Sequence, residues 1–148
     1  MAMQFIKIRP MSETDLEQVE CLERDCFSTP WSKTAFFEAL QNPVYRFYVA
    51  EENGIIVGQA GVIISFSEGE LTNVAVSAAH RKRGIAHELL QYIFSDVRND
   101  NVTEFTLEVR SGNKAAIALY EKLGFQSEGI RKNFYEKPTE DAVIMWKR

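Results

Sequence analysis

The chain has 148 residues, of which 45% are hydrophobic and 26% charged, and this fits a single domain with its own core. Its formal net charge of −4 is opposite in sign to the basic surfaces of nucleic-acid-binding proteins, so we expect no direct binding of nucleic acid. No apolar run is long enough to cross a membrane, and the first residues lack the apolar segment of a secretion signal. We therefore expect a cytoplasmic protein that does not bind membranes.

The two cysteines and two histidines do not have the spacing of zinc ligands, so we predict no metal site. Cys21 and Cys26 fall on one predicted helix, where their side chains should point roughly 140° apart and should not form a disulfide. We expect both to be small hydrophobic residues in or near the core. The sequence does not show whether His80 or His87 takes part in proton transfer.

The amino-terminal part of the chain predicts a strand and then a helix. Residues 5–9 alternate between apolar and polar side chains, and this strand should end at Pro10. Ser12 is placed to cap the next helix, with Asp15 near the capping-box position. A stripe of apolar residues with helical spacing extends that helix to about Phe27 and consists of Leu16, Val19, Leu22 and Cys26.

The segment Phe27–Ser32 interrupts the helical pattern, because Pro30 disfavours a helical conformation in the residue before it. Ser32 can then cap a second short helix, whose apolar side chains are Phe36, Phe37 and Leu40. Exposed aromatic rings are costly, so Phe27 and Trp31 should pack on something. Two interpretations stay open: a helix–helix joint buried in the core, and an aromatic lip over a substrate groove.

The middle of the chain predicts an antiparallel meander. An Asn-Gly pair at positions 53–54 is typical of a tight hairpin turn, and Gly58 and Gly61 suggest a bend or bulge in the strand that follows. The strands of this part are predicted at Arg46–Glu51, Ile55–Phe66 and Glu70–Val76.

The remaining elements alternate between helices and strands. Apolar residues at helical spacing predict an amphipathic helix over 85–97, and the strand after it should pair in parallel with the strand before it. Asn113 is a plausible cap for a short helix that Gly124 ends. The other predicted segments are Glu104–Val109, Lys114–Leu123, Gln126–Arg131 and Ala142–Trp146. We predict one α+β domain over residues 1–148, built on a central mixed sheet.

A basic loop precedes the helix at 85–97, with the sequence Arg81-Lys82-Arg83-Gly84. Cations, a glycine and a helix amino terminus together favour the binding of a phosphate group. Neither a Walker loop nor a dinucleotide-binding fingerprint is present. The apolar strand before the loop would suit an extended, uncharged chain, so a ligand with a phosphate head and an amide tail fits both parts. The alternative is a solvated basic turn.

Glu108 and Tyr120 are the candidate catalytic residues. If Leu107 and Val109 face the core, Glu108 points to the other face of the sheet, where it could act as a general base. The alternative is a carboxylate held in an ion pair with Arg110 or Arg131. Tyr120 could protonate a departing thiolate, or it could be a half-buried aromatic residue with its hydroxyl group in water.

Several motifs resemble those of the GNAT superfamily of N-acetyltransferases, and the resemblance covers nearly the whole chain. They are LTNVAV, RKRGIA and LEVRSGNKAAIALYEKLGF, in that order. FSTPWS, IRKNFY and EDAVIM further resemble the ribosomal-protein-alanine N-acetyltransferases within that superfamily. The resemblance implies a GNAT-like fold: a mixed, mostly antiparallel sheet of seven strands flanked by about four helices.

The resemblance also implies a reaction and its residues. Acetyl-CoA would donate an acetyl group, without a metal, to the α-amine of an N-terminal alanine in a small-subunit ribosomal protein. Glu108 corresponds to the general base of the family and Tyr120 to its general acid. The residues implied for the cofactor are Val74, Ala75 and Val76 along the pantetheine arm, Lys82, Arg83, Gly84, Ile85, Ala86 and His87 at the pyrophosphate, and Asn113 and Tyr120. Those implied for the substrate are Phe27, Pro30, Trp31 and Tyr135.

The sequence departs from the family pattern at three positions: Ala86 replaces a commoner glycine, His87 a frequent arginine and Phe134 a frequent tyrosine. Two alternative functions remain open at this point. One is an acetyltransferase for a lysine side chain or a small amine, and the other is a CoA-binding module without catalysis.

Overall fold

The structure is a computed structural model that describes residues 6–148. The helices of this part are the 3₁₀ helices η1 (Glu13–Asp15) and η2 (Ala78–His80) and the α-helices α1 (Leu16–Cys26), α2 (Lys33–Leu40), α3 (Ile85–Arg98) and α4 (Lys114–Lys122). Its strands are β1 (Lys7–Pro10), β2 (Tyr45–Glu52), β3 (Ile55–Ser65), β4 (Glu68–Leu71), β5 (Ala75–Val76), β6 (Glu104–Arg110), β7 (Gln126–Tyr135) and β8 (Glu140–Lys147).

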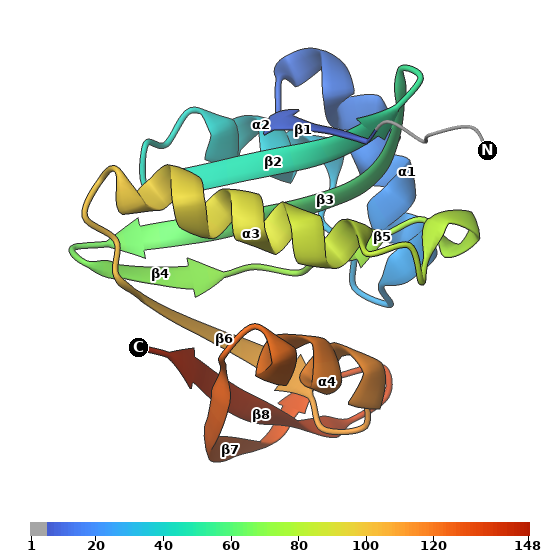
Figure 1. Cartoon of the computed structure of the whole chain (residues 1–148). Coiled ribbons are helices and arrows are strands. Elements are labelled where there is room, and N and C mark those ends of the chain that lie inside the picture. The colour runs from blue at the N-terminus through green and yellow to red at the C-terminus, as the bar shows by residue number, and fades with distance from the viewer. Residues whose placement is uncertain (1–5) are drawn as a thin grey trace.

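The strands of residues 6–148 form one mixed sheet in the order β1-β2-β3-β4-β6-β8-β7, with β5 paired to β3. The β4–β6 pair is parallel and the other pairs are antiparallel. Helices cover both faces: α3 and α4 lie in front of the sheet in Figure 1, and α1 and α2 lie behind its upper half. The predicted α+β architecture is therefore confirmed.

Strand β2 contributes side chains to the hydrophobic clusters on both faces of the sheet. Successive side chains of a strand point to opposite faces of the sheet. Tyr48 and Ala50 accordingly join the hydrophobic cluster under α3, whereas Phe47 and Val49 join the cluster under α1 and α2. All four are buried, which makes β2 a central strand with a core on each side.

Most of the predicted local signals are confirmed. Ser32 Oγ accepts a hydrogen bond from Ala35 N–H at 3.0 Å and caps α2. Asn53 and Gly54 both have positive φ angles, as the hairpin turn requires. The β2–β3 register shifts after Ala50, which places the expected irregularity beside Gly58.

Three expectations about the elements need correction. The predicted strand Glu70–Val76 is two strands, β4 and β5, so the sheet of residues 6–148 has eight strands and not seven. The last hairpin is longer than predicted, because β7 continues past Arg131 to Tyr135. This extension lies on an edge strand whose side chains are largely exposed, so it carries no alternating pattern. The first predicted strand begins at Phe5, which lies outside the described residues.

The third correction concerns Cys21, which is exposed, whereas Cys26 is half-buried; both are free thiols. The buried side of α1 consists of Leu16, Val19, Leu22 and Glu23. Cys21 lies outside that buried stripe on the helix surface and therefore faces water.

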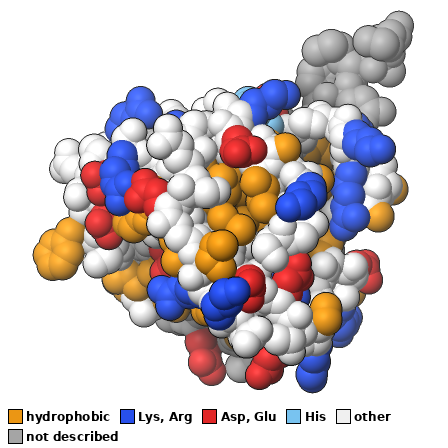
Figure 2. Space-filling model, turned by 90° about the horizontal axis from the view of Figure 1, so that it is seen from below, with side chains coloured by type: hydrophobic (Ala, Val, Ile, Leu, Met, Phe, Trp, Pro, Cys, Tyr) orange, Lys and Arg blue, Asp and Glu red, His pale blue; other side chains and the backbone are white. Residues whose placement is uncertain are grey.

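Edge strand β7 exposes two large hydrophobic side chains, Ile130 at 61% and Phe134 at 46%. Figure 2 shows the molecule from below, the side on which β7, β8 and α4 lie in Figure 1. Hydrophobic side chains gather near the middle of this face, with Lys, Arg, Asp and Glu side chains around them. Within residues 6–148, no helix is long and apolar enough to span a membrane.

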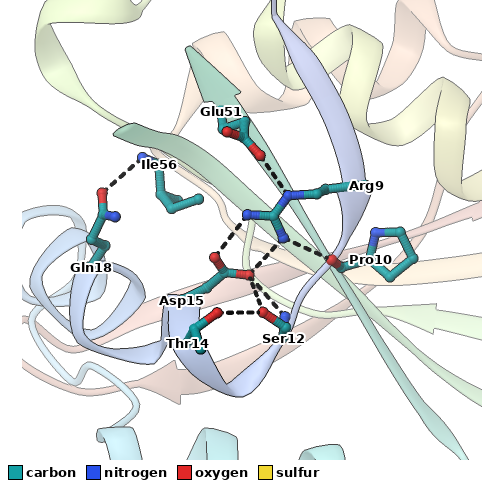
Figure 3. A network of polar contacts seen from close by, with 8 residues as sticks. All are labelled: Arg9, Pro10, Ser12, Thr14, Asp15, Gln18, Glu51 and Ile56. Atoms are coloured by element: carbon teal, nitrogen blue, oxygen red, sulfur yellow. Dashed lines mark hydrogen bonds and ion pairs between the residues drawn. The ribbon is translucent and has the colours of Figure 1, made fainter. Parts of the chain in front are cut away.

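A polar network joins the start of α1 to the sheet (Figure 3). The Arg9 guanidinium donates to both oxygens of Asp15 at 2.8 Å and to Glu51 at 2.5 Å. Ser12 N–H also donates to Asp15, at 2.8 Å, as the capping box predicts. One turn later, Gln18 accepts a hydrogen bond from Ile56 N–H at 2.8 Å. These contacts fix the end of α1 that lies far from Cys26.

We expect Asp15→Asn to lower the free energy of unfolding by about 2 kcal/mol near neutral pH, because hydrogen bonds to a charged group contribute roughly this much. The hydrogen bond from Arg9 lowers the pKa of Asp15 below its ordinary value of 3.8. The contribution of the carboxylate is therefore present above the unfolded-state pKa and lost as the pH falls through the lowered value. Urea unfolding at pH 7 and at pH values below 3.8 measures both effects.

Glu13→Gln is the matched control, since Glu13 lies in the same turn and is exposed. Equal losses in the two variants at pH 7, or a loss in Asp15→Asn that persists at low pH, would contradict this role of Asp15.

Candidate active site

The candidate site forms where two neighbouring strands separate. Strands β4 and β6 pair only from Glu68–Glu104 to Glu70–Thr106. Beyond that point β6 stays paired with β8, while the chain after β4 stays with β3 and pairs with it again through β5. Figure 1 shows β6 running away from β4. Cavities of about 590 Å³ and about 210 Å³ lie at this opening, and their shared walls are Cys26, Phe27, Val74, Asn113, Ala116 and Tyr120.

The larger cavity lies against the amino terminus of α3. Gly84 precedes the helix with a φ of 79°, a left-handed conformation that favours glycine. The hydrogen bond from Glu88 N–H to Gly84 O, at 3.0 Å, closes the first turn. The N–H groups of residues 85–87 come before it, so they have no partner in the helix. These residues line the cavity together with Arg81 and Lys82, and the site therefore favours an anion.

Arg83 does not lie where the resemblance implied. It is absent from the cavity lining, and its Nη2 lies 2.5 Å from Glu52 Oε2 at the end of β2. His80 Nε2 lies 3.3 Å from the other oxygen of Glu52, and Arg83 lowers the pKa of that carboxyl. The ion pair with Glu52 thus holds the basic loop in place. Arg83, which was expected to contact the ligand, stabilises the loop through this ion pair.

Arg81 was missed as an individual site residue, although it stands in the recognised motif. It lines the larger cavity, and its Nε donates to Val76 O at 3.1 Å. The apolar part of the cavity lining includes Val74, Ala75, Val76, Ile85, Ala115 and Leu119. A phosphate at the loop and an extended uncharged chain along this part could therefore bind together.

Glu108 lies on β6, where the burial of side chains alternates strictly. Leu107 and Val109 are buried, and Glu108 points to the opposite face, lines the smaller cavity and keeps 20% of its side chain exposed. Arg131 Nε lies 2.8 Å from Glu108 Oε2 as an ion pair that lacks hydrogen-bond geometry. The two interpretations of Glu108 therefore coexist: it is in the cavity, and it is ion-paired. Arg110, the other partner considered, pairs with Glu140 at 3.1 Å.

Tyr120 reaches the same opening from α4. Its side chain lines both cavities, and the residue is 7% exposed. Burial raises the pKa of its phenol to about 12, with a smaller contribution from Tyr135. The phenol is therefore protonated at neutral pH and can donate a proton. Asn113 accepts a hydrogen bond from Ala116 N–H at 3.1 Å and caps this helix, as its position predicts.

The four residues proposed for the substrate separate into two groups. Phe27 and Tyr135 line the smaller cavity, as the lip interpretation requires. Pro30 and Trp31 do not line it, and the Trp31 ring lies 5.2 Å from that of Phe36 in the core under α1 and α2. For Trp31 the helix–helix joint is therefore the correct interpretation.

Glu23 was not singled out from the sequence, although this residue contacts the segment Phe27–Ser32. It is 1% exposed, accepts from Trp31 N–H at 3.1 Å and accepts from Gln59 Nε2 at 2.8 Å. Burial raises its pKa, and these two hydrogen bonds oppose the rise. The available signal was a glutamate on the apolar stripe of α1, four residues after Val19. Within residues 6–148, no cluster of three or more His, Cys, Asp or Glu could hold a metal ion.

Comparison with known proteins places this geometry in a family. The model of the acetyltransferase (GNAT) family matches residues 16–125. The ribosomal protein bS18-alanine N-acetyltransferase of Escherichia coli K12 is 34% identical over 142 residues, which cover 93% of this chain and 94% of the relative. The N-alpha-acetyltransferase RimI of Mycobacterium tuberculosis is 32% identical over 146 residues, with coverage of 95% and 90%. The crystal structure of the E. coli ribosomal-protein-S18-alanine N-acetyltransferase superposes with a TM-score of 0.89 at 32% identity, covering 97% of this chain and 93% of that one.

Proposed function

The chain belongs to the acetyltransferase (GNAT) family and is an acetyl-CoA-dependent N-acetyltransferase, and we propose that it acetylates the N-terminal alanine of ribosomal protein bS18. The observation that carries this proposal is the meeting of Glu108 and Tyr120, from β6 and α4, in the wall of one cavity that adjoins the anion-binding loop. The E. coli relative, which matches along nearly the whole chain, bears the name of this reaction, and the M. tuberculosis relative is named as an N-alpha-acetyltransferase. A ribosomal protein as acceptor agrees with the cytoplasmic location expected from the sequence.

The larger cavity has the features that acetyl-CoA requires. The N–H groups of residues 85–87, with Arg81 and Lys82, would hold the pyrophosphate. The apolar stretch Val74–Val76 would lie along the pantetheine arm, and Asn113 would contact it at the end near α4. When bound, acetyl-CoA supplies an acetyl group activated as a thioester.

Glu108 and Tyr120 then act on protons at opposite ends of the reaction. An α-amino group has a pKa near 8, so it is mostly protonated at neutral pH and must lose a proton before it can attack. Glu108, in the smaller cavity, accepts that proton directly or through one water. Tyr120, whose pKa is raised to about 12, stays protonated at neutral pH and can donate its proton to the departing thiolate of CoA. Phe27 and Tyr135 would flank the acceptor chain.

We expect Glu108→Gln and Tyr120→Phe each to lower kcat by about a hundredfold or more, in the range typical of general acid–base catalysis. CoA should still bind, because neither change touches the loop at Gly84. Initial rates of CoA release and calorimetry of CoA binding measure the two properties separately. Glu104→Gln, on the same strand, and Tyr92→Phe, on the exposed side of α3, are the matched controls. Wild-type turnover in both catalytic variants would refute these roles.

The identity of the acceptor is tested with a panel of peptides. A peptide with the first residues of bS18 and a free N-terminal alanine should release CoA, and the same peptide with a blocked N-terminus should not. Polyamines should be poor acceptors, because the smaller cavity of about 210 Å³ places Glu108 beside Phe27 and Tyr135 rather than in open solvent. Activity on the blocked peptide would point to lysine acetylation, and inactivity on every acceptor would favour a CoA-binding module without catalysis.

A further inference from the structure

Cys26 is the last residue of α1 and lies where the two cavities meet. It is half-buried, has no disulfide partner and lines both cavities. Its Sγ lies 3.6 Å from Val76 O and 3.6 Å from Arg81 Nη2. The catalytic roles proposed above for Glu108 and Tyr120 make no use of this thiol.

We propose that Cys26 is a redox-sensitive modification site, which forms a mixed disulfide with the thiol of CoA under oxidising conditions. The proposal rests on the proposed function in two respects, namely that the larger cavity holds CoA and that the sulfur of CoA lies near Tyr120. It adds a covalent state of the same site, in which the enzyme is switched off and can be restored by a dithiol.

The proposed role of Tyr120 places the sulfur of CoA near Cys26. Its phenol is at the same junction, is 7% exposed and has no hydrogen-bond partner among residues 6–148. The hydroxyl oxygen is not among the buried side-chain atoms without a partner, so it is accessible from the cavities and can donate a hydrogen bond to a bound ligand. In the proposed reaction that ligand is the sulfur of CoA, which receives the proton of Tyr120. The sulfur of CoA would therefore reach the walls to which Cys26 belongs.

The smaller cavity also gives an oxidant access to Cys26, whose half-buried sulfur accepts a hydrogen bond from Arg81 Nη2 at 3.6 Å. The smaller cavity, on the side of Glu108, provides a path to Cys26 for a small oxidant while CoA occupies the larger one.

Hydrogen peroxide is the oxidant in this reaction, and two steps complete it. The sulfur of Cys26 attacks one peroxide oxygen, the O–O bond breaks, and a sulfenic acid and one water form. The thiol of CoA then attacks the sulfenic sulfur, an S–S bond forms, and the hydroxyl group leaves as water with the proton of CoA. The two sulfur atoms together lose two electrons, which the peroxide accepts.

The product would block both halves of the site. CoA linked to Cys26 occupies the larger cavity, so acetyl-CoA cannot enter, and the bond lies across the route from the larger cavity to Glu108. A dithiol would break the S–S bond and release CoA unchanged.

Cys21 provides an internal control on the same helix. It is exposed, lines neither cavity, and has its own guanidinium, because Arg24 Nη2 lies 3.3 Å from its Sγ. Each cysteine therefore lies beside an arginine of its own, but the two differ in access to bound CoA. Trypsin cleaves after Arg24, which places Cys21 and Cys26 in different peptides for mass spectrometry.

The test treats the protein with CoA and equimolar hydrogen peroxide and maps the adducts by mass spectrometry. We expect CoA on Cys26 at about ten times the extent on Cys21 or more, because binding raises the local concentration of the thiol. Glutathione in place of CoA should not show this preference. Cys21→Ser should keep the adduct on the peptide of residues 25–33, and Cys26→Ser should remove it. Acetyl transfer should fall with the extent of the adduct on Cys26 and return with dithiothreitol.

Calorimetry of CoA binding on the same sample separates the two hypotheses. CoA binding without an adduct on Cys26, or with equal adducts on both cysteines, would overturn this inference alone. Absence of CoA binding would overturn the proposed function and this inference with it.

Discussion

The site depends on one constraint in the sheet: β4 and β6 share hydrogen bonds over only three residue pairs before their partners differ. Strand β6 remains bound to β8 as far as Arg110, and the chain after β4 continues along β3 through β5. A parallel sheet that continued along both strands would fill this space with backbone. Because it ends, both cavities open there, and side chains from both layers of helices reach the same point.

Rigid elements hold each side of the opening. Arg9 and Asp15 fix one end of α1, and the buried pair of Glu23 and Gln59 fixes the other, next to the residues that line the cavities. On the other side, the cap at Asn113 holds the helix that carries Tyr120. Side chains on anchored helices and strands keep their positions better than side chains on loops, which suits a transfer between two bound molecules.

Local patterns were sufficient to predict part of this site. The alternation around Glu108, the cap at Asn113 and the glycine before α3 each depend on neighbours in sequence, and each prediction agrees with the structure. Arg83 could not be placed in this way, because its partner Glu52 is 31 residues away along the chain. Trp31 likewise lies in the core because of rings on other elements. The break between β4 and β5 lies where residues 72–74 face only Ala60 and Gly61 of β3, a strand that no local window contains.

The central claim is that the start of α3, beside the opening, binds the phosphates of CoA, and calorimetry of CoA binding to Gly84→Glu tests it most directly. Gly54 is a matched position: both glycines have a φ of 79°, and at both an added side chain would meet nothing within 4 Å. Gly54→Glu therefore adds the same charge and the same backbone strain away from both cavities. We expect Gly84→Glu to lose CoA binding and Gly54→Glu to keep it. Equal CoA affinity in the two variants would contradict the account.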